Sequence, residues 1–179
     1  DYILEKKVNL KKEISVVITR FKDGTLSFYE PIENEHRNQI LFKSKIPADI
    51  SNKIFEQAIS NAKKISEKFN YVGVLTVEFF ITKDDELLVN ELAPRFHNSL
   101  HLSINAFNIS QFENHVLAVC DLGSKPIGKI SNAEMYNILG FEILEYRKKT
   151  FKKNEFFYDY LKKEPREGRK MGHITILKD

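Results

Sequence analysis

Hydrophobic residues along the chain repeat with two periods, and each period predicts a different kind of element. Apolar runs rich in β-branched and aromatic residues predict strands. The strongest cover residues 14–21, 74–81 and 87–91, and shorter ones cover 1–4, 25–29, 40–42, 133–139, 156–161 and 172–177. The charged segment 5–12 is typical of a connector, and the polar segments 33–39 and 95–102 are typical of loops.

Apolar residues spaced three and four apart predict a helix over residues 47–70. Pro47 suits its first turn, and the loop resumes at Asn70. Ser110 and Glu113 have the spacing of a capping box, which predicts a second helix from Ser110 to Cys120. This order of elements predicts an α+β fold, a mainly antiparallel sheet with helices on one face followed by a small β-rich part. The turn-rich segment 123–128 predicts a boundary, which gives domains at 1–122 and 123–179.

Two carboxylates in the predicted hairpin give the first indication of chemistry. Glu78 and Glu91 each interrupt an apolar strand, and they come near one another if the strands pair symmetrically about the turn. Alternation places Glu91 on the same face as Leu87 and Val89. Neighbouring carboxylates repel unless a cation lies between them or one is protonated, so a magnesium site is one candidate, to which Asn90 could add an amide oxygen. Two charges on a solvent-facing sheet are the alternative.

The segment 94–101 follows these carboxylates and gathers an arginine, two histidines, an asparagine and a serine. Arg95 with nearby amide and hydroxyl groups would suit a small anion. A zinc pair of His97 and His101 ranks low, because the glutamate that follows the first histidine in zinc-protease helices is absent. A polar connector without a ligand is the alternative.

Segment 162–173 is a second candidate anion site, with five basic residues around Pro165, Gly168 and Gly172. Such a loop can hold a phosphate with side chains and backbone N–H groups, although a solvated charged loop is an equal alternative. Nucleic acid binding is less favoured, because the loop lacks interleaved aromatic residues and the net charge is only +3.

Composition narrows the classes of protein to which the chain can belong. The 179 residues are 42% hydrophobic, enough for one good core, and no apolar run approaches the ~20 residues that span a bilayer. Cys120 is the only cysteine, so no internal disulfide forms; we expect it to be buried, in a protein of the cytoplasm. The chain starts at Asp1 within a strand-like run, which predicts a piece of a longer protein.

Several segments together resemble one known family. They are GVLTVEFF at 73–80, LVNELAPRFHNSLHLSI at 88–104, SQFENH at 110–115 and GRKMGHIT at 168–175. With EKKVNLKKEISVVITR at 5–20 and ENEHRNQIL at 33–41, they are similar in order to the N5-carboxyaminoimidazole ribonucleotide synthases, ATP-grasp carboxylases of bacterial and fungal purine biosynthesis. Leu100 and Leu102 depart from the small residue and the aromatic of many members. The chain resembles the C-terminal part of such an enzyme, because it lacks the family's Gly-rich phosphate loop.

The resemblance implies a role for each matched residue. At the nucleotide it places Glu5, Lys6, Lys7, Val8, Glu13, His36, Asn90 and Glu91, the first four mostly through backbone groups and Glu13 at the ribose. At magnesium it places Glu78 and Glu91. Facing bicarbonate and the ribonucleotide it places Arg95, His97 and Asn98 as catalytic residues, with Ser99 beside them. At the ribonucleotide 5′-phosphate it places Lys163, Arg169 and Lys170.

The implied reaction uses ATP and Mg²⁺ to convert bicarbonate to carboxyphosphate, which then carboxylates the amine of 5-aminoimidazole ribonucleotide. Family members tend to be homodimers, so a homodimer is expected, with neither nucleic acid nor membrane as a partner. Alternatives are another ATP-grasp ribonucleotide ligase, such as formate-dependent glycinamide ribonucleotide transformylase, or a non-catalytic binding domain. The 179-residue chain alone is expected to have little or no activity.

Overall fold

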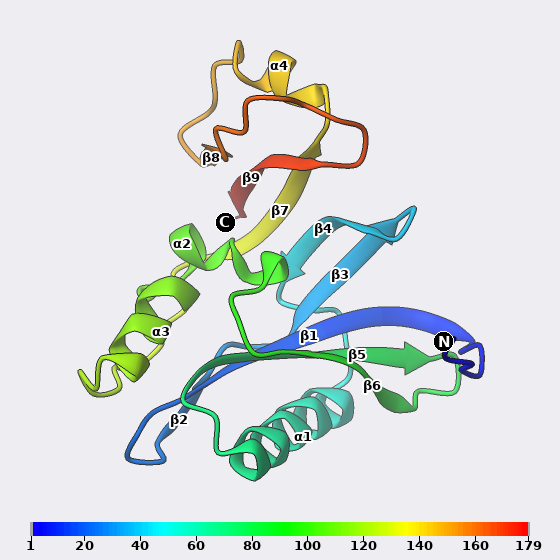
Figure 1. Ribbon diagram of the computed structural model, residues 1–179, viewed down its shortest axis with the longest axis vertical. Coiled ribbons are helices and arrows are strands. Elements are labelled where there is room, and N and C mark those ends of the chain that lie inside the picture. Colours follow the sequence, from blue (N-terminus) through cyan, green and yellow to red (C-terminus); the bar gives the residue numbers. More distant parts are fainter. Residues whose placement is uncertain (1, 179) are drawn as a thin grey trace.

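A single antiparallel sheet organises the computed structural model, which describes residues 2–178 (Figure 1). Eight strands follow the order β6-β5-β1-β3-β4-β7-β9-β8, and β2 pairs with β1 beside this path. Their bounds are β1 Leu10–Arg20, β2 Leu26–Phe28, β3 Ile32–Arg37, β4 Ile40–Ile46, β5 Gly73–Thr82, β6 Leu87–Ala93, β7 Asn132–Leu139, β8 Glu155–Asp159 and β9 Lys170–Lys178. Every pairing among these strands is antiparallel, as the sequence predicted.

Helix α1, Asn52–Phe69, covers one face of the sheet beneath β1 and β5 (Figure 1). Ser51 caps it by accepting from the Ile54 N–H, and Asn70 ends it in a left-handed conformation. Its buried residues pack on the alternate positions of the strands that point toward it. That cluster is Ile54, Ala58, Ile59 and Ala62 with Ile14, Val16, Ile18, Leu75, Val77, Phe79 and Ile81. Burial of this apolar stripe is what stabilises the layer.

The opposite face carries three more helical segments: η1 Asn98–Leu100, α2 Ser103–Ala106 and α3 Gln111–Val119. Leu100 and Leu102 pack against Val17 there, and Asn114 of α3 donates to Thr19 Oγ1. Helices therefore cover both faces of the sheet, so the expectation of helices on one face is wrong. The predicted α+β fold with a mainly antiparallel sheet is confirmed. Strand side chains alternate between faces, so β1 supplies apolar groups to both layers.

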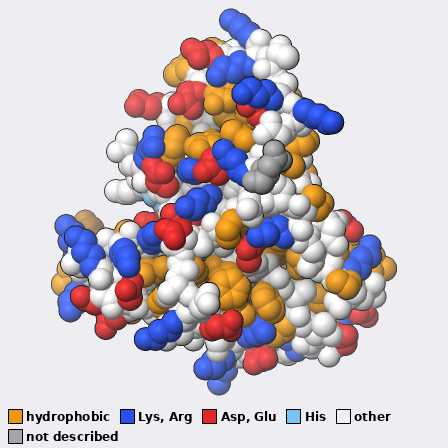
Figure 2. Space-filling view, turned by 180° about the vertical axis from the view of Figure 1, so that it is seen from behind, with side chains coloured by type: hydrophobic (Ala, Val, Ile, Leu, Met, Phe, Trp, Pro, Cys, Tyr) orange, Lys and Arg blue, Asp and Glu red, His pale blue; other side chains and the backbone are white. Residues whose placement is uncertain are grey.

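The C-terminal strands continue the same sheet, because β4 pairs with β7 from Lys43–Tyr136 to Ile46–Ala133. Helix α4, Glu142–Tyr146, which the sequence did not predict, adds Ile143 to a small core with Ile138, Met171 and Ile174. The division of the chain into two domains at residue 122 stays a prediction. Acidic and basic side chains are mixed over the face shown in Figure 2, in keeping with the small net charge.

Several local predictions are wrong. Residues 2–4 are exposed and form no strand, while Asp1 lies outside the described residues. Residues 10–12 belong to β1 rather than to a connector, and residues 32–37 form β3 rather than a loop. Helix α1 begins at Asn52, five residues beyond Pro47. Cys120 is exposed, because it follows the last buried turn of α3. No helix among residues 2–178 is long and apolar enough to cross a membrane.

Candidate active site

The β5–β6 hairpin places Glu78 and Glu91 directly opposite one another, as the sequence predicted. The register then shifts, so that Phe79 opposes Val89 and Asn90 is an extra residue on β6. This β-bulge turns Asn90 toward Glu78, and Asn90 Nδ2 donates to Glu78 Oε2 at 3.3 Å. The predicted sharing of a face by Glu91, Val89 and Leu87 is wrong for the same reason, since a bulge reverses alternation beyond it.

His97 returns over β5 and contacts the half-buried Glu78 carboxylate. Its Nε2 lies 2.9 Å from Glu78 Oε1. The hydrogen bond from His97 is the largest effect on Glu78 and lowers the pKa of this carboxyl; burial opposes it, and the proximity of His97 and His36 lowers the pKa further. Glu78 is therefore held as a carboxylate, the form that binds a hard cation.

A buried polar chain extends behind His97. Its Nδ1 is 2.8 Å from Ser99 Oγ, which is 2.8 Å from Ser15 Oγ on β1. Asn34 Nδ2 donates to Ser15 Oγ at 3.0 Å, and Ser44 Oγ donates to Asn34 Oδ1 at 3.0 Å. The sequence did not identify Ser15, Asn34 and Ser44 as residues of the site. Ser15 interrupts an apolar run, and its pairing opposite Glu78 is the signal that could have found it.

Asn98 has a different partner. Its Nδ2 donates to Asn137 Oδ1 at 3.0 Å, and Asn137 Nδ2 donates to the Leu41 carbonyl at 2.8 Å. A carbonyl only accepts, so Leu41 fixes the orientation of both amides. Asn98 Oδ1 remains buried without a hydrogen-bond partner among the described residues.

Glu13 and His36 form a second charged pair on the same face as Glu78. Glu13 Oε2 lies against His36 Nδ1. This contact raises the pKa of His36, because the carboxylate favours the protonated ring; Glu78 acts in the same direction and Lys170 in the opposite one. The structure thus brings these two predicted nucleotide residues to the edge of the carboxylate site.

Lys170 is the predicted phosphate residue that reaches this cluster. Its ammonium is half-buried, and burial together with Arg95 and Lys162 lowers its pKa, while Glu78 raises it. Arg95 is exposed and Lys162 donates to the Lys170 carbonyl at 2.6 Å. Lys170 is therefore close enough to Glu78 and to Arg95 for each to influence the pKa of its ammonium.

Other predicted residues stay apart from this cluster. Lys163 and Arg169 are exposed in the loop before β9, where Arg169 Nη1 donates to the Glu164 carbonyl. Glu5, Lys6 and Lys7 are exposed ahead of β1, and Val8 is half-buried. The structure gives no side-chain hydrogen bond from residues 5–8 to other described residues, so their assigned place at the nucleotide stays a prediction.

His101 and His173 form a histidine cluster to which the sequence did not assign a role in the site. His101 and His173 have ring centroids 5.4 Å apart, and Tyr160 Oη is 2.9 Å from His173 Nδ1. Burial, with the nearby side chains of His97 and Lys170, lowers the pKa of His101 to about 4; burial and His101 lower the pKa of His173 to about 3. Both rings are therefore neutral at physiological pH and act in packing and hydrogen bonding.

A preformed metal centre is not apparent, since no group of three or more His, Cys, Asp or Glu side chains among residues 2–178 has that arrangement. The donor set nevertheless fits magnesium, which is often held by one or two carboxylates plus substrate phosphates. Glu78 is ionised and Glu91 is exposed directly opposite, free of an ion pair within the described chain. These two carboxylates, with Asn90 beside them, are the residues that could hold the ion.

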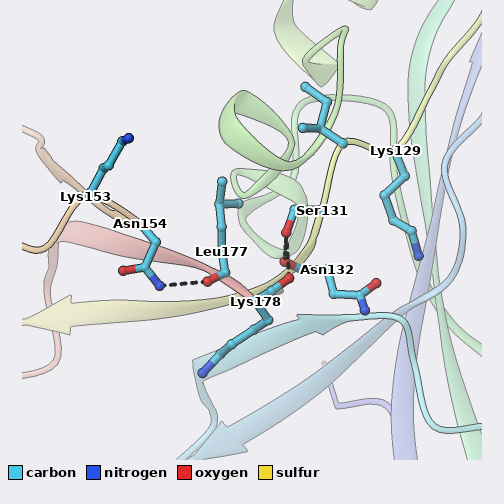
Figure 3. Close-up of a pocket in the computed structure, with 8 residues that line it drawn as sticks. Lys129, Ser131, Asn132, Lys153, Asn154, Leu177 and Lys178 are labelled. Atoms are coloured by element: carbon cyan, nitrogen blue, oxygen red, sulfur yellow. Dashed lines mark hydrogen bonds between the residues drawn. The ribbon is translucent and has the colours of Figure 1, made fainter.

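A separate hollow of about 650 Å³ lies near the end of β9 (Figure 3). Three lysines line it, but Lys129 pairs with Glu30 at 2.8 Å and Lys178 pairs with Glu134 at 3.0 Å. Its positive charge is therefore largely balanced, and we assign it no ligand.

Comparisons with known proteins agree with this geometry. A model of the ATP-grasp domain matches residues 1–112, and a model of the phosphoribosylaminoimidazole carboxylase C-terminal domain matches residues 133–179. N5-carboxyaminoimidazole ribonucleotide synthase of Bacillus subtilis is 44% identical, over 98% of this chain and 47% of that protein. The chain thus spans about half the length of the curated relatives it matches.

Solved structures give the same family. Staphylococcus aureus N5-carboxyaminoimidazole synthetase, complexed with ADP, aligns with a TM-score of 0.89 at 41% identity, over 98% of this chain and 47% of that one. The Aspergillus clavatus synthase, in complex with ADP and 5-aminoimidazole ribonucleotide, aligns with a TM-score of 0.90 at 30% identity, over 97% and 48%. The chain therefore belongs to the ATP-grasp family, in the branch of the N5-carboxyaminoimidazole ribonucleotide synthases.

Proposed function

We propose that this chain supplies the metal-binding and substrate-facing half of an enzyme that carboxylates 5-aminoimidazole ribonucleotide with ATP and bicarbonate. ATP would phosphorylate bicarbonate to carboxyphosphate, and attack by the exocyclic amine would release phosphate and give the N5-carboxy product with ADP. The observation that carries the proposal is the convergence of Glu78, His97 and Lys170 beside Glu91. By analogy with the family, the enzyme would be a cytoplasmic homodimer.

Each residue has a task that phosphoryl transfer requires, which is positioning and charge neutralisation. Glu78 and Glu91, with Asn90, would hold Mg²⁺, which when bound neutralises charge on the transferring phosphoryl group. Glu13 and His36 would orient the nucleotide, and residues 5–8 would lie at the adenine through their backbone groups.

The second substrate would lie on the loop side of the hairpin. Arg95, His97 and Asn98 would face bicarbonate and the aminoimidazole, with Ser99 supporting the ring of His97. Lys170, together with the exposed side chains of Lys163 and Arg169, would bind the 5′-phosphate as charge-assisted donors. The partly buried ammonium of Lys170 is the strongest of these, because solvent and salt screen its charge least.

The test is release of ADP by the full product of the gene, measured with ATP, bicarbonate and 5-aminoimidazole ribonucleotide and with each omitted in turn. We expect turnover only with all three, and little or none from the 179-residue chain alone. Glu91→Gln should abolish magnesium-dependent turnover. The matched control is Glu86→Gln, the same change at an exposed position in the turn of the same hairpin.

Three results would contradict the proposal. Turnover with formate and glycinamide ribonucleotide in place of bicarbonate and the aminoimidazole would identify the transformylase alternative. Equal activity of Glu91→Gln and Glu86→Gln would remove the metal assignment. Absence of nucleotide-dependent activity with any of these substrates would favour a non-catalytic binding domain.

A further inference from the structure

We propose that Ser15, Asn34 and Ser44 are positioning residues that orient His97 so that its Nδ1 accepts hydrogen bonds and its Nε2 donates one. Together with Ser99 they form a continuous hydroxyl–amide chain, defined by Ser44, Asn34, Ser15 and Ser99. The catalytic consequence rests on the proposed function, whereas the hydrogen-bond pattern of the His97 ring follows from this chain's own contacts.

The chain of hydrogen bonds crosses the sheet from its middle to the carboxylate hairpin. Ser44 lies on β4, Asn34 on β3, Ser15 on β1 and Ser99 on η1. All four are buried, with three of them fully inaccessible and Asn34 8% exposed. Successive polar atoms are 3.0, 3.0 and 2.8 Å apart. Removing one member of such a fully paired buried network would lower the stability of the protein, because its neighbours would be left without hydrogen-bond partners.

The direction of these hydrogen bonds is set at the imidazole. The backbone N–H of Ser99 donates to His97 Nδ1 at 3.4 Å, and a backbone N–H cannot accept. On the other side of the ring, Nε2 is 2.9 Å from a Glu78 carboxylate oxygen, which accepts and does not donate. Both partners therefore require an unprotonated Nδ1 and a proton on Nε2.

This assignment determines every hydroxyl behind the ring. Ser99 Oγ must donate to His97 Nδ1, so it accepts from Ser15 Oγ. Ser15 in turn accepts from Asn34 Nδ2, and Asn34 Oδ1 accepts from Ser44 Oγ. Each donor and acceptor along the path is used in one direction only, and the reverse direction would place a proton on Nδ1 against the Ser99 N–H.

A ring held in this tautomer is a donor and not a general base. Nε2 carries a proton that points to Glu78, and Nδ1 is occupied by two donors. With magnesium on Glu78, the Nε2–H remains suited to an anionic oxygen, of which bicarbonate and carboxyphosphate have several. The proton on the attacking amine would then have to leave to a group other than His97.

The tautomer can be measured directly on the 179-residue chain by long-range ¹H–¹⁵N correlation of the histidine rings, with His97 assigned by comparison with His97→Gln. The measurement is made at about pH 8, above the ordinary histidine pKa of about 6.5. We expect a protonated, pyrrole-type Nε2 and an unprotonated, pyridine-type Nδ1. A proton on Nδ1, alone or with one on Nε2, would overturn the proposal.

Asn34→Asp tests the role of the hydroxyl–amide chain. A carboxylate only accepts, so Ser15 would turn its proton toward the new carboxylate, and Ser99 would turn its own toward Ser15. Nδ1 would lose its stronger donor while keeping the Ser99 N–H, so its pyridine-type ¹⁵N signal should remain and shift downfield. The matched control is Asn114→Asp, since Asn114 is also fully buried and donates to two hydroxyls, at Thr19 and Ser27, without a path to His97.

An unchanged His97 spectrum in a folded Asn34→Asp variant would refute the positioning role. In the full gene product we expect Asn34→Asp to lower kcat about 10–100-fold, a range typical of residues that orient ligands from behind, and Asn114→Asp to leave the His97 spectrum unchanged. Failure of the proposed reaction would appear separately, as an inactive wild-type enzyme with the expected His97 tautomer.

Discussion

Replacing Gly172 with alanine should destabilise the C-terminal strands by an amount that the geometry allows to be bracketed. A Cβ at this position would lie 2.5 Å from the Tyr158 carbonyl, a backbone atom of β8. Contacts under 3.0 Å are essentially never seen for real Cβ atoms, so β8 and β9 would have to move apart by about half an ångström or more. Overpacking of this kind costs roughly 1–3 kcal/mol.

The movement cannot be absorbed by a side chain, because the atom in the way belongs to the backbone. Gly172 pairs with Asp159, and the adjacent pair is His173 with Tyr158, whose rings stack with centroids 4.7 Å apart. Asp159 is also held by Arg147 at 2.6 Å. The shift would therefore disturb a strand pair, a ring stack and an ion pair together.

The assay is urea unfolding of the 179-residue chain, with the midpoint and the m-value compared between variants. Gly128→Ala is the matched control, since a Cβ there meets only Asn108 side-chain atoms at 3.7 Å. Alanine reduces the entropy of the unfolded chain, which stabilises a protein by about 0.4–1 kcal/mol where the site accepts it. If Gly172→Ala unfolds at the same or a higher urea concentration than Gly128→Ala, the steric argument is wrong.

Three further predictions concern stability and exposure. Burial opposes ionisation of Glu134, but hydrogen bonds led by Lys43 outweigh it and lower its pKa to about 2. Glu134→Gln should therefore cost about 1 kcal/mol near neutrality. The urea midpoints of the two proteins should converge as the pH falls from about 4.5 toward 2, where the wild-type carboxylate takes up its proton. Ser51→Ala should cost about 1 kcal/mol by removing the cap of α1, whereas Ser60→Ala on the exposed side of that helix should not, by the same unfolding assay. Cys120 should react with a thiol reagent in the native protein, and reaction only after denaturation would contradict its exposure.

The sequence was sufficient where a single period and local turn chemistry decide the structure. The β5–β6 hairpin and its facing pair Glu78 and Glu91 followed from alternation about a short polar turn. The cap at Ser110 followed from its own side chain and Glu113. These features depend on residues close in the chain, so the sequence pattern contains most of their determinants.

The incorrect predictions have one physical cause, which is contact between residues far apart in the chain. The sequence of β3 resembles a polar loop, because the strand contributes polar side chains such as His36 to the site. These polar residues interrupt the apolar alternation by which a strand is recognised. The bulge at Asn90 reversed the predicted face of Val89. Ser15 joined the site because a loop 84 residues away, carrying Ser99, folds back over β1. Contacts at such separations leave no local period.

The position of the last third of the chain explains why both matched family segments are needed for one site. The carboxylate hairpin lies at one edge of the sheet and β8 at the other, so strand pairing alone would keep Lys170 away from Glu78. The segment around η1 bridges this distance, because Asn98 donates to Asn137 of β7 while His97 contacts Glu78 of β5. Adjacent residues of one short turn thus connect β7 with β5, across the three strands that lie between them. A small displacement of β7 would be transmitted through Asn98 to the ring of His97, and so the strands matched to the C-terminal domain determine the geometry at the carboxylates as well as the position of the cationic loop.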